Sequence, residues 1–185
     1  MTLRPKDLIL RLLNEHRIMT IATNRPDGWP QATMVGYIND GFMIYCFVAR
    51  NAQKYANIVR DSRISGAIGS DADVPLNIKG LSLAGRARVV EDRDEWNHVA
   101  ALRLKRYPEY AALPPPVVSA GAVSRIAPRP PTSGVALLRI EAEVFSVLDY
   151  SKGFGHSDLV TFSERDLDRH LESLRHRWDG APGAE

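Results

Sequence analysis

The chain has 185 residues and a formal net charge of +2; 44% of its residues are hydrophobic and 25% are charged. These values are typical of one globular domain with a substantial core, and the scattered Lys and Arg residues lack the basic stripe of a nucleic-acid-binding protein. The single cysteine, Cys46, excludes an internal disulfide, and no apolar run is long enough to span a membrane. We therefore expect one domain over residues 1–185 that works in the cytoplasm, without a membrane or nucleic-acid partner.

The first predicted element is an amphipathic helix over residues 5–16. Pro5 suits the first turn of a helix, where its missing N–H is not needed. Four apolar residues then recur at helical spacing and form one face: Leu8, Ile9, Leu12 and Leu13.

Residues 18–90 are predicted to form the core of the domain, which begins with three strands. The first strand starts at Ile18 and ends at the turn 25–28; the second covers residues 31–38, and the third covers residues 42–48 after the turn 39–41. Both turns contain Asp-Gly, which supplies the left-handed backbone positions of a tight turn. Two successive hairpins predict a three-stranded meander.

The rest of the core is predicted as a helix over residues 51–60, a strand over residues 64–69 and a longer strand over residues 76–90. Gly85 interrupts the alternation of the long strand. A glycine in a strand interior indicates a bulge or a close backbone approach.

After the core, a helix is predicted over residues 92–112, with Asp92 and Glu95 in the positions of a capping box. Residues 113–134 are rich in proline and are expected to form a surface excursion. The alternation of residues 135–148 predicts a returning strand, and residues 163–178 predict a final helix.

The start of the predicted helix at residues 51–60 has the features of a phosphate site. Arg50 and Lys54 supply positive charge and Gln53 supplies an amide, beside backbone N–H groups that no helical carbonyl uses. The alternative is an exposed helix terminus whose charges are solvated.

Several segments, in this order and spacing, resemble the pyridoxamine 5′-phosphate oxidase-like FMN-binding split barrels. They are the residues 20–23, 27–33, 54–65 and 85–92, so that the resemblance covers roughly residues 8–112. It implies a mainly β split barrel with peripheral helices, in which residues 18–90 form the barrel core. It also implies a homodimer that binds FMN at the subunit interface.

The resemblance places cofactor contacts in four parts of the chain. Lys54 matches the phosphate-binding lysine of the family, Gln53 stands where the family has an arginine, and Arg50 is expected to compensate. The strand that runs along the flavin ring is matched by Gln31, Ala32, Thr33, Met34 and Val35. A Tyr-Thr pair of the oxidase is matched by Tyr45 and Cys46, and its Arg-Gln pair by Lys79 and Gly80.

The segment 150–158 contains Gly153, Phe154, Gly155 and His156 and matches no part of the family pattern. We interpret it as a loop near the flavin, with His156 as the candidate proton donor or polar substrate contact. A connection between the last strand and the last helix is the alternative. Metal binding is not predicted, because the five histidines lack a ligand spacing.

The sequence departs from the true oxidase, which carries a tryptophan and an Arg-x-His motif near its C-terminus. We therefore expect a flavin-dependent oxidoreductase that acts on a small molecule other than vitamin B6, with NAD(P)H as a candidate reductant. The alternative is a non-catalytic protein that binds or stores a flavin, a deazaflavin or haem. The physiological substrate is left open.

Overall fold

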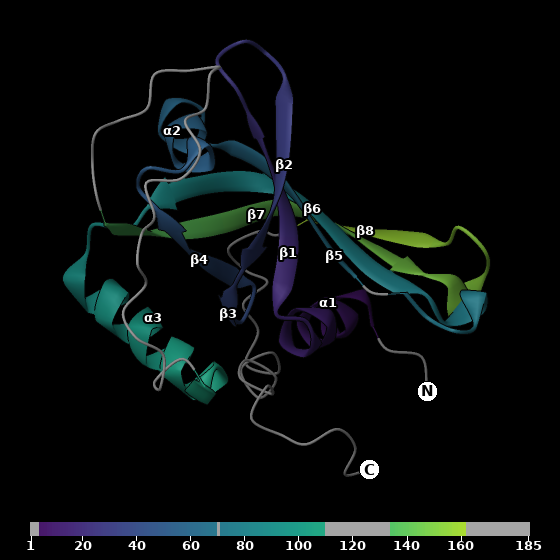
Figure 1. Ribbon diagram of the computed structural model, residues 1–185. Helices are drawn as coiled ribbons and strands as arrows, with labels where there is room; N and C mark the ends of the chain where they lie inside the picture. The colour runs from purple at the N-terminus through teal and green to yellow at the C-terminus, as the bar shows by residue number, and fades with distance from the viewer. Residues whose placement is uncertain (1–3, 70, 110–133, 162–185) are drawn as a thin grey trace.

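A computed structural model describes residues 4–69, 71–109 and 134–161 (Figure 1). Within these ranges the chain forms the following helices, strands and short 3₁₀ turns (η), in chain order: α1 (Pro5–Glu15), β1 (Ile18–Asn24), β2 (Pro30–Gly36), β3 (Ile38–Asp40), β4 (Met43–Ala49), α2 (Gln53–Arg60), β5 (Arg63–Gly69), η1 (Pro75–Asn77), β6 (Lys79–Val89), α3 (Arg93–Arg106), β7 (Val135–Asp149), η3 (Tyr150–Lys152) and β8 (Ser157–Thr161).

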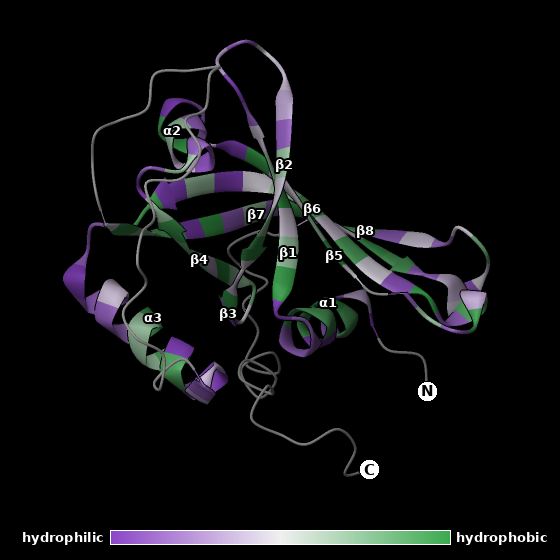
Figure 2. Ribbon diagram, viewed as in Figure 1, coloured by the Kyte–Doolittle hydropathy of each residue, from purple (hydrophilic) through white to green (hydrophobic). Residues whose placement is uncertain are grey.

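All the described strands belong to one antiparallel sheet, in the order β2-β1-β5-β6-β7-β4-β3. β4 pairs with residues 135–140 of β7, and β8 pairs with residues 144–148 of β7. The sheet curls into a half barrel, and α1 lies at its lower side while α3 flanks β3 and β4 (Figure 1). The strands alternate between hydrophobic and hydrophilic residues, as expected when one face of each strand is buried (Figure 2). The predicted mainly β split barrel with peripheral helices is confirmed.

The core is divided into two clusters by β4. Ile44, Cys46 and Val48 point into the barrel, where they join the apolar face of α1. Tyr45 points the other way, into a smaller cluster with Val99 of α3. Full burial of a leucine or isoleucine side chain stabilises a fold by about 2 kcal/mol, so α1 is a structural part of the barrel.

A buried arginine joins α1, β3 and α3. The guanidinium of Arg106 donates hydrogen bonds to the backbone carbonyls of Leu13, at 3.0 Å, and of His16, and also to the side chain of Asn39. These carbonyls lie at the C-terminus of α1, where the helix leaves its last acceptors unpaired. Arg106 therefore supplies the C-terminal contacts that the sequence of α1 lacks.

The predicted three-stranded meander is wrong. The chain breaks at Tyr37, and the second predicted strand becomes β2 and the short β3. β3 pairs with β4 across the turn at Gly41, but β4 then pairs with β7 rather than with β2. The buried Tyr37 causes the break, because its N–H donates to Arg17 O at 3.1 Å and its hydroxyl donates to Leu13 O at 2.9 Å.

Two smaller differences concern the later elements. The loop expected over residues 150–158 ends earlier, because strand β8 begins at Ser157 and pairs with β7. Glu95 completes only half of the capping box: its N–H donates to Asp92 Oδ1 at 2.7 Å, whereas its carboxylate binds Tyr45 and Arg139. Most of the proline-rich segment and the helix predicted at residues 163–178 lie outside the described residues. Among the described helices, none is long and apolar enough to cross a membrane.

Gly85 lies where β6 and β7 approach most closely. The register between these strands shifts between Ala84 and Gly85, and a Cβ atom at Gly85 would overlap Glu141 O and lie 2.8 Å from Ala142 Cα. Both neighbours are backbone atoms, which cannot move without distorting the longest strand pair. The predicted close approach is therefore confirmed.

Gly85→Ala should lower the free energy of unfolding by about 3 kcal/mol, because the added methyl group overpacks two backbones. Chemical denaturation would measure it, with Gly36→Ala as the control, since a Cβ there would meet only Arg17 O at 3.9 Å. Equal stability of the two variants would contradict the close approach.

Candidate functional site

The candidate site lies where the first turn of α2 faces the edge strand β2. α2 follows β4 directly and lies beside the β1–β2 hairpin (Figure 1). In the described part of the sheet β2 pairs only with β1, so its other edge leaves backbone N–H and C=O groups without a strand partner. Such an edge can bind the polar rim of a planar ligand through its backbone.

Lys54 extends from α2 to this edge. Its Nζ lies 3.4 Å from Met34 O on β2, and no carboxylate of the described residues lies within ion-pair distance. Burial lowers the pKa of the Lys54 ammonium from its ordinary value. A charged group that is partly desolvated and lacks a counter-ion is stabilised when an anion binds beside it.

The side chains of β2 point alternately to two faces. Gln31, Thr33 and Val35 face inward, whereas Ala32 and Met34 are exposed on the outer face. The hydroxyl oxygen of Thr33 is buried, and no described residue forms a hydrogen bond with it. A buried hydroxyl without a partner costs free energy, and a ligand with an acceptor group would satisfy it.

Asn57 links α2 to both strands of the hairpin. Its Nδ2 donates to Thr23 Oγ1 and to Gln31 Oε1, at 3.0 Å each, and its Oδ1 accepts from Gln53 Nε2 at 2.9 Å. Asn57 is fully buried. The sequence analysis predicted no role for Asn57 or Thr23. A polar asparagine beside Ile58, on the buried face of a short helix, could have indicated that Asn57 has buried hydrogen-bond partners.

Arg50 lies just before α2, and its backbone N–H donates to Gly134 O at 2.9 Å. Its Nη1 donates to the hydroxyl of Tyr55 at 2.9 Å, so the guanidinium is held against α2. The structure therefore brings Gln31, Thr33, Met34, Gln53 and Lys54 together, with Arg50 on the adjoining turn.

Tyr45 and Cys46, predicted as a cofactor-binding pair, point to opposite faces of β4. The hydroxyl of Tyr45 donates to Glu95 Oε1 at 3.0 Å under α3, and burial and this carboxylate raise the pKa of Tyr45. Cys46 points into the barrel, where burial raises the pKa of its thiol to about 12 and the charge of Lys54 lowers it slightly. Cys46 is thus a protonated core residue near Lys54, and Tyr45 belongs to the contact with α3.

Lys79 and Gly80 lie at the opposite end of the sheet from α2. Gly80 pairs with Gly69 and Leu148, and the Nζ of Lys79 lies 3.7 Å from Asp149 Oδ1. The start of β6 and the turn η1 are at the lower right in Figure 1, whereas α2 is at the upper left. One copy of the chain does not bring these residues to Lys54.

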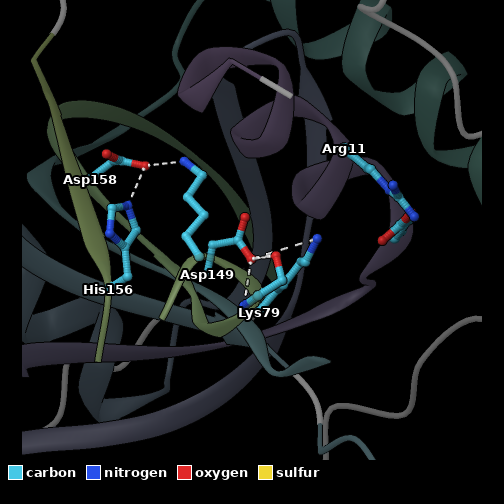
Figure 3. Close-up of polar contacts among 8 residues, drawn as sticks. Arg11, Lys79, Asp149, His156 and Asp158 are labelled. Atoms are coloured by element: carbon cyan, nitrogen blue, oxygen red, sulfur yellow. Dashed lines mark hydrogen bonds and ion pairs between the residues drawn. The ribbon is translucent and has the colours of Figure 1, made fainter. Parts of the chain in front are cut away.

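His156 lies at the same far end, in the connection between η3 and β8 (Figure 3). Asp158 accepts from Lys152 Nζ at 2.6 Å, and His156 Nε2 lies 3.2 Å from the same carboxylate oxygen. Asp149 in turn accepts from the Ser151 hydroxyl at 2.5 Å. These contacts brace the connection, while the ring of Phe154 at its tip is 83% exposed. His156 therefore belongs to a different cluster from Lys54.

The described residues contain no group of three or more His, Cys, Asp or Glu side chains that could hold a metal ion. The donors at α2 and β2 are instead an ammonium, amides, a hydroxyl and backbone groups. This donor set suits an anionic group such as a phosphate, attached to a ligand with an acceptor-rich edge.

Three solved structures of similar fold have names that state a function. A haem-binding protein from Mycobacterium smegmatis is 22% identical, with a TM-score of 0.62, over 87% of this chain and 60% of that chain, so the present chain is the shorter of the two. A pyridoxamine 5′-phosphate oxidase-like protein from Listeria innocua is 18% identical over 79% of this chain and 99% of that chain, with a TM-score of 0.57. The haem storage protein HutZ from Vibrio cholerae is 17% identical over 76% of this chain and 92% of that chain, with a TM-score of 0.56.

At these identities the likeness shows the fold alone. No curated protein matches the sequence. The model of the family "Pyridoxamine 5′-phosphate oxidase", however, matches residues 5–144, which include β1, β2, α2 and most of the sheet. The chain therefore belongs to the pyridoxamine 5′-phosphate oxidase family, with the split-barrel fold of that family.

Proposed function

We propose that the protein binds FMN, with the phosphate at the first turn of α2 and the flavin ring along the free edge of β2. The observation that carries this proposal is the Lys54 ammonium, which has no described counter-ion and lies 3.4 Å from the backbone of an edge strand. The phosphate would be held by Lys54, by the free N–H groups of the first turn of α2 and, from the adjoining turn, by Arg50. The buried hydroxyl of Thr33 would gain a partner.

Haem is the second candidate ligand, because two proteins of similar fold are described as haem-binding and haem storage proteins. The α2 site itself favours a flavin phosphate. Its described donors include no histidine, and the buried Cys46 thiol, whose pKa is raised to about 12, is not ionised at neutral pH. Haem iron prefers a histidine or a thiolate as its axial ligand.

Bound FMN would supply two-electron chemistry, and the chain would supply position and charge. We propose a flavin-dependent oxidoreductase with a small-molecule substrate and NAD(P)H as reductant, rather than a vitamin B6 oxidase. Pyridoxamine 5′-phosphate has its own phosphate and needs a second cationic cluster. The described lysines at the far end, Lys79 and Lys152, are each paired with an aspartate.

The outer face of the sheet supports a homodimer. Two rows of aligned residues cross the six strands β2, β1, β5, β6, β7 and β8 without a charge. In this strand order the rows are Met34, Thr20, Ala67, Ser82, Ser146 and Leu159, and Ala32, Ala22, Ser65, Ala84, Val144 and Thr161. An uncharged exposed face of this extent is typical of an interaction surface.

A second copy on this face would also complete the site. A two-fold axis that runs across the strands exchanges the two ends of the sheet. Lys79 and Gly80 of one copy would then approach Lys54 of the other, so that both predicted groups of residues could contact one flavin. The flavin would lie at the subunit interface.

Lys54→Ala should weaken FMN binding about 10- to 100-fold, because a charge-assisted contact to the phosphate is lost. Riboflavin, which has no phosphate, should lose less than about twofold. Flavin fluorescence titration measures both affinities, with Lys105→Ala on α3 as the control. Equal losses for the two ligands would place the phosphate elsewhere.

Excess NADPH or NADH, added anaerobically, should bleach the visible absorption of the FMN-bound protein within seconds to minutes, as expected of an ordinary reductase turnover. Pyridoxine 5′-phosphate should not bleach it. A flavin that resists both nicotinamides would favour the storage protein, and bleaching by pyridoxine 5′-phosphate would contradict the exclusion of vitamin B6.

Ala67→Arg, in the centre of the uncharged face, should convert a dimer to a monomer, because the buried arginine would have no partner. Leu104→Arg is the matched control, since Leu104 is 53% exposed on α3, away from this face. Multi-angle light scattering measures both. A monomeric parent chain with FMN bound would rule out the shared site.

A further inference from the structure

Asn57 is the point at which three elements meet beside the proposed phosphate site. Its side chain is fully buried and contacts Thr23 on β1, Gln31 on β2 and Gln53 on α2. The three hydrogen bonds are 2.9 to 3.0 Å long. Both N–H bonds of the amide are used, and its oxygen has an N–H donor.

α2 has few other means of holding its position. It has eight residues, its N-cap residue Ala52 forms no side-chain cap, and its only buried residues are Asn57 and Ile58. Ile58 packs into the apolar core, where contacts are not directional. Two exposed side chains of α2 also reach the hairpin: Arg60 Nη2 donates to Asn24 O at 2.9 Å, and Lys54 Nζ lies 3.4 Å from Met34 O. The amide of Asn57 therefore supplies the buried directional contacts between α2 and the β1–β2 hairpin.

The direction of the hydrogen bond from Asn57 also determines which end of the Gln31 amide is free to bind a ligand. Because Gln31 Oε1 accepts from Asn57, the Nε2 group of Gln31 is the end that stays available as a donor. Gln31 and Thr33 face the same side of β2, and Lys54 reaches the backbone of the next residue, Met34. The amide network thus arranges a set of hydrogen-bond donors at one place.

We propose that Asn57 is a positioning residue for the phosphate-binding group: it fixes the first turn of α2 against β2, so that the Lys54 ammonium and the Gln31 amide face one anion. This inference rests on the proposed binding of FMN at Lys54. Asn57 itself does not touch the ligand. Its effect should therefore appear in the preference for FMN over riboflavin, and most of that effect should depend on Lys54.

The test uses the full chain and measures one ratio, the dissociation constant for riboflavin divided by that for FMN. This ratio falls when FMN binding weakens more than riboflavin binding. Asn57→Leu keeps the approximate size of the side chain and removes all three hydrogen bonds, whereas Asn57→Asp keeps the shape and replaces the donors by acceptors. Each should lower the ratio about tenfold, as expected when one charge-assisted contact is misplaced. Riboflavin affinity should change less than about twofold.

Two controls separate positioning from general stability. Phe145→Leu, in the core at β7, should lower the melting temperature without changing the ratio, because Phe145 pairs with Leu83 and Val160 and takes no part in the amide network of Asn57. In a Lys54→Ala chain, Asn57→Leu should lower the ratio much less, because the charged group that it positions is gone and only the Gln31 amide remains. Should Asn57→Leu fail to fold, Gln53→Leu removes one arm of the network from a half-buried side chain and should lower the ratio severalfold.

Asn57 variants that keep the parent ratio while melting earlier, as Phe145→Leu does, would overturn the positioning role. An undiminished effect of Asn57→Leu in the Lys54→Ala chain would also overturn it. If Lys54→Ala leaves the ratio unchanged, the proposed phosphate site at Lys54 is wrong. The failure of that proposal can therefore be told apart from the failure of the positioning role of Asn57.

Discussion

The break in the chain at Tyr37 determines the rest of the structure. Its N–H and hydroxyl bind the backbone around the end of α1, so the chain turns away after β2 and begins β3 on the far edge of the sheet. β2 is consequently left with a free edge instead of joining β4. α2, which follows β4, lies beside that edge, and the candidate site exists because the barrel does not close there.

The two ends of the sheet have different electrostatic character. At the α2 end, Lys54 is partly buried without a described counter-ion, and the neighbouring polar groups are amides and hydroxyls. At the η3 end, each described lysine is matched by an aspartate. Paired charges stabilise the local structure, whereas a partly desolvated cation without a counter-ion is a candidate binding group for an anion. The contrast explains why the site is assigned to α2 and not to the region around His156.

The fold and part of the candidate site could be predicted from the sequence, because the signals for them lie in short stretches of the chain. Alternation, Asp-Gly turns and the spacing around Lys54 are short-range signals, and they located the strands, α2 and the cation. The meander failed because the role of Tyr37 depends on Arg17 and Leu13, which pack against it only in three dimensions. Asn57 was missed for the same reason, since its partners come from three elements. Tyr45 and Cys46 were grouped as neighbours, although adjacent residues on a strand point to opposite faces.

Binding of the FMN phosphate by Lys54 and α2 can be observed by ³¹P NMR of FMN bound to the protein. The phosphate signal should stay constant from about pH 5 to 8, because the adjacent cation and N–H groups keep the phosphate fully ionised below its usual second pKa near 6. In the Lys54→Ala protein the signal should titrate again. A signal that titrates in the parent protein as it does in free FMN would contradict the claim, because the phosphate would then lie in solvent.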